Sequence, residues 1–193
     1  MRRITAITIA FTIGHSVTLV LGTLGLPVPQ QPVEALIAVS ILISAVHAVR
    51  PVFPGREPLV AGAFGLVHGM AFSMTLAAMD LSDLRLGLSL LGFNLGIEIM
   101  QLIVLPPLVA LSRTRIYTPL RTVAAAVTAI AATGWLLDRV GLANPIGAVA
   151  DALGGVSPWI VPGVWVAAAA VLVRRRVCAG RADRPADRDT VRS

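Results

Sequence analysis

The fold is decided by residues 87–101, GLSLLGFNLGIEIMQ, an apolar run that predicts a membrane-spanning helix. Its polar side chains are Asn94, Glu98 and Gln101, which fall at positions i, i+4 and i+7 and therefore share one face of a helix. An ionisable residue near the centre of a bilayer costs roughly 2.5–3.5 kcal/mol on insertion scales. We therefore expect Glu98 to have a partner or a function inside the membrane.

Two other apolar runs carry a histidine at their midpoint. His15 stands in FTIGHSVTL, residues 11–19, and His68 stands in FGLVHGMAF, residues 64–72. A polar side chain that is buried alone in the bilayer is costly, so residues from different helices are expected to meet there. We predict that these two segments and residues 87–101 enclose an intramembrane polar site.

The composition is that of an integral membrane protein. Of the 193 residues, 56% are hydrophobic and only 13% are charged, and apolar stretches repeatedly reach the ~20 residues that cross ~30 Å of hydrocarbon. These stretches predict an all-α fold, a polytopic membrane helical bundle. Cys178 is the only cysteine, which excludes an intrachain disulfide and a cysteine metal cluster.

We expect about six transmembrane helices within residues 1–173 and a basic, disordered tail over residues 174–193. The expected spans are residues 4–26, 32–49, 58–79, 86–111, 118–137 and 158–173. A cleaved signal peptide is the alternative for the first run, but this run is long and has no clear cleavage site. The segment from 138 to 157 is expected to lie in the membrane interface or to re-enter the membrane.

The arginines indicate the topology. All sixteen basic residues are arginine, and in the six-helix layout only Arg85 and Arg139 fall on the side of the membrane opposite both chain ends. Because cytoplasmic loops are enriched in basic residues, we expect the N- and C-termini in the cytoplasm. This pattern also explains the net charge of +6, and we expect no nucleic acid as a partner.

The predicted site residues lie at similar depth. With a rise of 1.5 Å per residue, His15, His68 and Glu98 fall close to the bilayer midplane, while Asn94 and Gln101 lie about one turn to either side. Two imidazoles, a carboxylate and amide oxygens can coordinate Ni²⁺, Co²⁺, Zn²⁺ or Fe²⁺. The same groups can instead relay protons, or the histidines can simply form interhelical hydrogen bonds to serine or backbone carbonyl groups.

Four more polar residues are candidates for the surroundings of the site or for the ion pathway. Thr12 and Ser16 interrupt the first apolar run next to His15. Glu34 is expected in the first turn of the second helix, where a carboxylate suits the helix dipole. His47 continues a mildly polar stripe along the same helix. For Glu34 and His47, which lie nearer the membrane surfaces, a purely structural role is the main alternative.

Glycine pairs accompany two of the polar positions. Gly65 and Gly69 bracket His68, and Gly92 and Gly96 bracket Asn94. Small residues four apart allow membrane helices to approach closely. We therefore expect the third and fourth spans to pack together at the depth of the site.

The motifs of common enzymes are missing from the sequence. It contains no Gly-x-Ser-x-Gly elbow, and Ser16 directly follows His15, so a helix would point the two side chains to different faces. His-Glu-x-x-His is also missing. We expect no enzymatic activity, although a membrane-embedded metal-dependent oxidase or hydrolase is a lesser alternative.

Four segments resemble the HupE/UreJ family of small bacterial membrane proteins, in the family's order. They are FTIGHSVTL at 11–19, VEALIAVS at 33–40, FGLVHGMAF at 64–72 and FNLGIEIMQ at 93–101. The resemblance covers roughly residues 4–111 and implies a multi-pass protein of the bacterial inner (plasma) membrane. It also implies transport of a divalent metal ion, nickel or cobalt, as substrate, with no organic cofactor.

Within this resemblance, His15, His68 and Glu98 are the predicted metal ligands. The alternative function is a non-transporting membrane subunit or scaffold for metalloenzyme assembly, with homo-oligomers or metalloenzyme maturation factors as partners besides the lipid bilayer. The family usually begins with another helix that carries a Gly-x-Asp-His element, and nothing in this sequence corresponds to it. We expect either a start further upstream or a shortened member.

Overall fold

The computed structural model describes residues 2–25, 29–79, 81–155 and 157–182, and every regular element in them is a helix. The all-α fold expected from the sequence is confirmed. In chain order the helices are α1 (Arg2–Thr23), α2 (Gln30–Val49), α3 (Glu57–Ala77), α4 (Asp83–Ser112), α5 (Tyr117–Arg139), α6 (Pro145–Gly154) and α7 (Ser157–Ala182).

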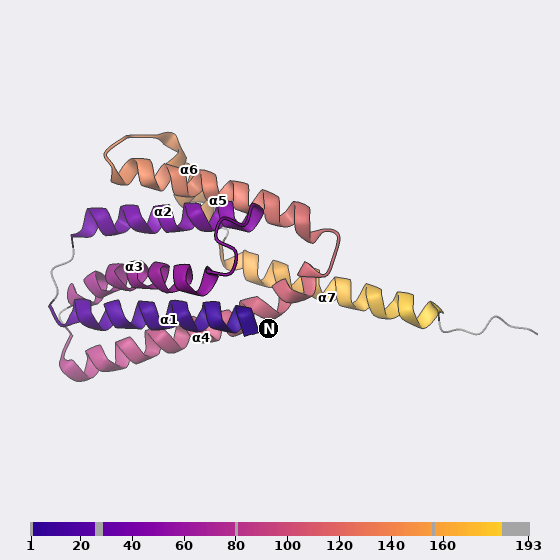
Figure 1. The fold of residues 1–193 in the computed structure, drawn as a ribbon, viewed down its shortest axis with the longest axis horizontal. Helices are drawn as coiled ribbons and strands as arrows, with labels where there is room; N and C mark the ends of the chain where they lie inside the picture. The colour runs from indigo at the N-terminus through magenta and orange to yellow at the C-terminus, as the bar shows by residue number, and fades with distance from the viewer. Residues whose placement is uncertain (1, 26–28, 80, 156, 183–193) are drawn as a thin grey trace, which may run out of the picture.

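The first five helices run up and down in an antiparallel bundle (Figure 1). α1 packs most extensively against α3, and α2 packs most extensively against α5, while α2 also contacts α3. α7 contacts α4, where Nε1 of Trp165 donates to the carbonyl oxygen of Ile103 at 3.0 Å. It then extends beyond the other helices at the end of the bundle where the chain begins (Figure 1).

Five of the described helices, α1 to α5, are long and apolar enough to cross a membrane. Large apolar side chains such as Leu95, Leu102 and Ile130 are exposed on the outside of the bundle, which is the arrangement expected for helices surrounded by lipid. The apolar part of α7, Pro158–Arg174, is shorter. The sixth span, predicted over 158–173, therefore stays a prediction.

Glycines allow the backbones of α1 and α3 to touch. A Cβ atom on Gly65 would collide with the carbonyl oxygen of Phe11, and one on Gly69 would collide with that of His15. Gly92 and Gly96 of α4 have nothing within 4 Å of an added Cβ. The expected close packing of the third and fourth spans through both glycine pairs is therefore wrong, because the partner of the α3 glycines is α1.

α4 agrees with the predicted span 86–111 to within a few residues, whereas α7 is longer than the sequence suggested. α4 continues through Pro106 and Pro107 to Ser112, as membrane helices allow when neighbouring groups satisfy the freed carbonyls. α7 runs to Ala182 instead of ending at 173, because its arginines, alanines and valine are compatible with a helix. Residues 183–193 of the predicted tail lie outside the described residues.

The segment between α5 and α7 contains the short helix α6, which packs against α5. Its start is fixed by Asn144, whose Oδ1 accepts hydrogen bonds from the backbone N–H groups of Ile146 and Gly147 at 3.0 and 3.1 Å. This is the usual role of asparagine before a helix that begins with proline. The Nδ2 of Asn144 donates to Oδ1 of Asp138 at 2.7 Å, which ties α6 to the end of α5.

Candidate functional site

His15 lies in a box of aromatic rings. Its imidazole stacks with Phe93 of α4 at a centroid distance of 5.3 Å and with Phe11 at 6.0 Å, and Phe72 of α3 meets it edge-on at 5.8 Å. The side chain is 1% exposed, and neither ring nitrogen has a hydrogen-bond partner in the described residues. A buried polar side chain without a partner is costly. Packing alone therefore does not explain why a histidine stands at position 15.

His68 is held by a serine of the neighbouring helix. Its Nε2 lies 2.9 Å from Oγ of Ser40 on α2. The single hydroxyl proton of Ser40 is donated to the carbonyl oxygen of Ile37 at 2.7 Å, so its oxygen must accept from His68. This assignment places the imidazole proton on Nε2 and leaves the lone pair of Nδ1 available for a ligand.

Glu98 and Asn94 connect α4 to α1. Oγ1 of Thr12 donates to Oε1 of Glu98 at 2.7 Å, and Oγ of Ser16 donates to Oδ1 of Asn94 at 2.6 Å. Four of the predicted site residues thus form two hydrogen-bonded pairs, Thr12 with Glu98 and Ser16 with Asn94. Both pairs are only partly buried, so this polar contact between α1 and α4 is not enclosed in the centre of the bundle.

The three predicted metal ligands do not form a preformed cage. Within the described ranges, no group of three His, Cys, Asp or Glu side chains is arranged to hold a metal ion. Glu98 pairs with α1, His68 pairs with α2, and His15 is enclosed by rings. The ring of Phe11 contacts both histidines, with centroid distances of 6.0 Å to His15 and 5.8 Å to His68.

His47 has a structural contact at the end of α2. Its Nδ1 accepts a hydrogen bond from the backbone N–H of Val52 at 3.1 Å, and its ring stacks on Phe53 at 4.0 Å. Both contacts hold the loop between α2 and α3. Among the described residues, no contact of His47 supports the predicted role in the ion pathway.

Glu34 lies at the opposite end of α2. Because α2 begins at Gln30, Glu34 is in the second turn and not in the first, so the expected interaction with the helix dipole is replaced by an ion pair. Its Oε2 lies 2.5 Å from Nε of Arg139, and its Oε1 accepts from Nε2 of Gln30 at 2.9 Å. The side chain of Gln31 donates to the carbonyl oxygen of Arg139 at 2.7 Å. These contacts fasten the start of α2 to the end of α5.

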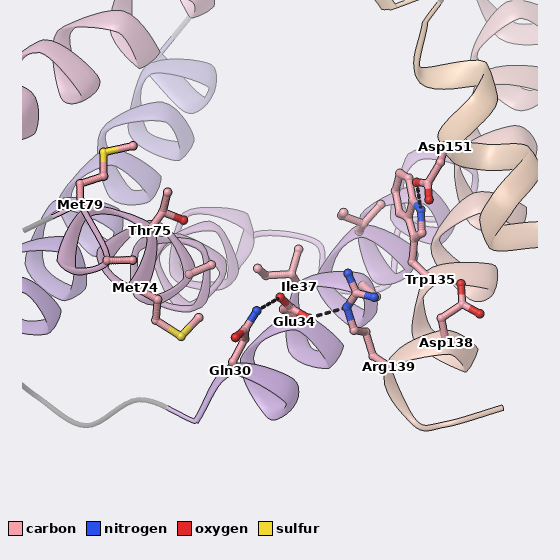
Figure 2. A pocket seen from close by; sticks show the side chains of 14 residues that line it. Gln30, Glu34, Ile37, Met74, Thr75, Met79, Trp135, Asp138, Arg139 and Asp151 are labelled. Atoms are coloured by element: carbon pink, nitrogen blue, oxygen red, sulfur yellow. Dashed lines mark hydrogen bonds and ion pairs between the residues drawn. The ribbon is translucent and has the colours of Figure 1, made fainter. Parts of the chain in front are cut away.

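The Glu34–Arg139 pair lies in a cavity of about 800 Å³, which we call the acidic pocket (Figure 2). Asp138 and Asp151 also line it, and Oδ1 of Asp151 accepts from Nε1 of Trp135 at 2.8 Å. Three carboxylates and one guanidinium leave the lining with a charge of −2 when all are ionised. The remaining lining residues include Met74, Thr75 and Met79 of α3.

A second cavity of about 870 Å³, the apolar cavity, lies next to the acidic pocket. His68, Ser40 and Gln101 line it, and Oε1 of Gln101 is buried without a hydrogen-bond partner in the described residues. Its other polar lining groups are Thr8, Ser44, Tyr117, Arg121 and Thr128. No carboxylate is among its lining residues, and most of the wall is aliphatic.

The two cavities follow one another along the same helices. On α3 the apolar cavity is lined by residues from Ala61 to His68 and the acidic pocket by residues from Ala71 to Met79. On α2 the two linings meet at Ile41, which belongs to both. His68 is thus the last residue of α3 in the lining of the apolar cavity, about one turn before Ala71, the first in the lining of the acidic pocket.

Asp138, Asp151 and Arg121 line these cavities but were not singled out as site residues from the sequence. Asp138 and Asp151 were assigned to an interfacial segment, and Arg121 was counted only for topology. The available signal was weak: each is a charged residue close to the end of an apolar run. Which neighbour such a residue faces depends on helix packing and cannot be read from hydropathy.

The family model described as HupE / UreJ protein matches residues 1–139, the part of the chain that forms α1 to α5. It therefore covers the two histidines, the α1–α4 contacts and most of both cavities. No curated protein and no solved structure matches the chain.

Proposed function

The chain belongs to the HupE/UreJ family, and on that premise we propose that it transports a divalent transition-metal ion, nickel or cobalt, across the bacterial inner membrane. The observation that carries this proposal is the position of His68. An imidazole suited to a borderline divalent metal lies about one helical turn from the first α3 residue of the negatively charged pocket.

The acidic pocket is the entrance in this proposal. Its lining has an excess of two negative charges, which raises the local concentration of cations. Since each carboxylate already accepts a hydrogen bond or an ion pair, a hydrated cation is attracted without being trapped. Weak initial binding of this kind suits a pathway through which the ion must move on.

His68 is the first ligand that the ion meets beyond the pocket. Ser40 fixes the ring and leaves Nδ1 free to bind the metal. Glu98 and His15 complete the ligand set after α4 shifts against the α1–α3 pair and the side chains reorient, because the described conformation does not gather the three side chains. The carboxylate of Glu98 then supplies the negative charge that a dehydrated divalent cation needs in the membrane.

The test is uptake of Ni²⁺ and Co²⁺ into proteoliposomes that contain the full chain. We expect uptake by the unmodified protein and a loss of at least tenfold in His68→Ala and Glu98→Gln. Asp83→Asn is the matched control for the glutamate, because Asp83 is an exposed carboxylate in the first turn of the same helix. Normal uptake by both site variants would refute the assignment. A folded protein with no uptake and no metal binding would support the scaffold function instead.

A further inference from the structure

Arg121 is a cationic side chain with no ion pair or hydrogen bond among the described residues. It lies in the second turn of α5 and lines the apolar cavity. Its Nε is buried without a hydrogen-bond partner, and its guanidinium carbon lies 5.8 Å from the ring centre of Tyr117. An aromatic face attracts the charge but accepts no ordinary hydrogen bond, so the two terminal NH2 groups of the guanidinium remain available for an anion.

The cavity beside Arg121 has the shape of an amphipathic ligand site. Arg121 and Tyr117 line the cavity where α5 begins. Aliphatic side chains line most of the rest of its volume of about 870 Å³. Leucine, isoleucine and valine side chains of α4, α5 and α7 belong to this lining: Leu105, Leu108, Leu120, Ile160 and Val164. Since no carboxylate is present in this lining, the protein itself supplies no counter-charge.

We propose that the apolar cavity binds an anionic phospholipid, with the headgroup phosphate on Arg121 and an acyl chain along the aliphatic wall. Arginine binds phosphate with two parallel hydrogen bonds. Basic pockets between transmembrane helices at a membrane surface are recognised sites for anionic headgroups. Arg121 lies in the second turn of a membrane-length helix, so it is at the depth where such headgroups are found.

Other occupants fit the cavity less well. A small soluble anion would pair with Arg121 but would leave the aliphatic wall without a partner. At the Arg121 end of the cavity, where α5 begins, a metal cation would be repelled by the guanidinium and would find no carboxylate in the lining. A zwitterionic lipid would fill the volume but would bring no net charge to Arg121.

The experiment measures lipid binding by the purified full chain in detergent, by native mass spectrometry and by thermal unfolding. Phosphatidylglycerol, phosphatidylcholine and inorganic phosphate are added separately. We expect phosphatidylglycerol to remain bound and to raise the Tm, and the other two to do so much less. Arg121→Gln should weaken the apparent affinity for phosphatidylglycerol at least tenfold, the effect of losing hydrogen bonds between two charged groups.

Arg115→Gln is the matched control, because Arg115 is exposed in the turn before α5, does not line the cavity and loses the same charge. Val164→Trp is a second variant, which fills the aliphatic part and should also weaken retention without changing any charge. Equal lipid binding in Arg121→Gln and Arg115→Gln would overturn the proposal. So would a Tm increase by phosphate alone equal to that by phosphatidylglycerol, or full retention in Val164→Trp. None of these measurements depends on metal transport.

Discussion

Nε2 of His68 lies 2.9 Å from Oγ of Ser40, so a serine of α2 orients the imidazole of α3 at the level where the acidic pocket meets the apolar cavity. This contact joins two helices that have few other polar links in the described structure. It also decides which ring nitrogen faces a ligand, because the proton on Nε2 is committed to the serine oxygen.

Ser40→Ala should therefore weaken metal binding without unfolding the protein. Loss of a partner that orients a metal-binding histidine typically reduces affinity about 10- to 100-fold. Titration of purified protein with Ni²⁺ or Co²⁺ measures the effect. Ser112→Ala is the control, since Ser112 likewise donates to a carbonyl three residues earlier but is exposed at the end of α4. Equal affinities in the two variants would show that Ser40 does not position His68.

His15→Phe separates a functional role from a packing role. The ring remains stacked between Phe11 and Phe93, while two buried nitrogens without partners are removed. Replacing unsatisfied polar atoms by an apolar ring of similar shape is expected to leave the free energy of unfolding unchanged within about 1 kcal/mol or to raise it. Metal uptake should nevertheless fall at least tenfold. A variant that keeps full uptake would remove His15 from the site.

Gly65→Ala should destabilise the bundle. The added Cβ would collide with the carbonyl oxygen of Phe11, so α1 and α3 must separate, at a cost of about 1–3 kcal/mol. Gly96→Ala is the control, because the added Cβ meets nothing within 4 Å and alanine favours a helix. Thermal unfolding in detergent should show a lower Tm for Gly65→Ala only. An equal Tm for both variants would contradict the tight α1–α3 contact.

Charge changes at the acidic pocket should alter uptake in a graded way. The lining charge of −2 becomes −3 in Arg139→Gln, −1 in Glu34→Gln and −2 again in the double variant. At low ionic strength we expect uptake from dilute metal to rise in the first, fall in the second and return to the original rate in the third. These differences should nearly vanish at about 1 M salt, where the Debye length is about 3 Å.

Stability should respond much less to these charge changes. The side chains of Arg139 and Glu34 are 45% and 29% exposed, and an ion pair of this exposure contributes at most about 1 kcal/mol. The Tm values of the three variants should therefore remain close to that of the unmodified protein. Arg85→Gln, which removes an exposed arginine outside the pocket, should leave both uptake and Tm unchanged.

Hydropathy and spacing predicted the helices well, because a long apolar run has few alternatives to a helix in a membrane. The polar contacts were only partly predictable. Asn94 and Glu98 were correctly placed on one helix face, and both turn that face to α1. Their partners, Ser16 and Thr12, depend on how α1 is rotated about its own axis. Apolar periodicity does not predict this rotation when all sides of a helix are hydrophobic.

The glycine pattern shows a similar limit. Gly65 and Gly69 do mark a close helix contact, but the sequence does not say with which helix. The pairing of α3 with α1 depends on the three-dimensional order of the helices. The cavities were also beyond prediction, since they result from side chains of several helices and are bounded by residues as distant as Gln30 and Asp151.

The glycine contact between α1 and α3 has a mechanical consequence. Because backbone touches backbone there, we expect these two helices to move together as one block. α2 and α5 form the other main pair of the bundle. The hydrogen bond between Ser40 of α2 and His68 of α3 links the two pairs. Tilting one block against the other would lengthen the Ser40–His68 hydrogen bond, so the orientation of the imidazole is coupled to the angle between the two helix pairs.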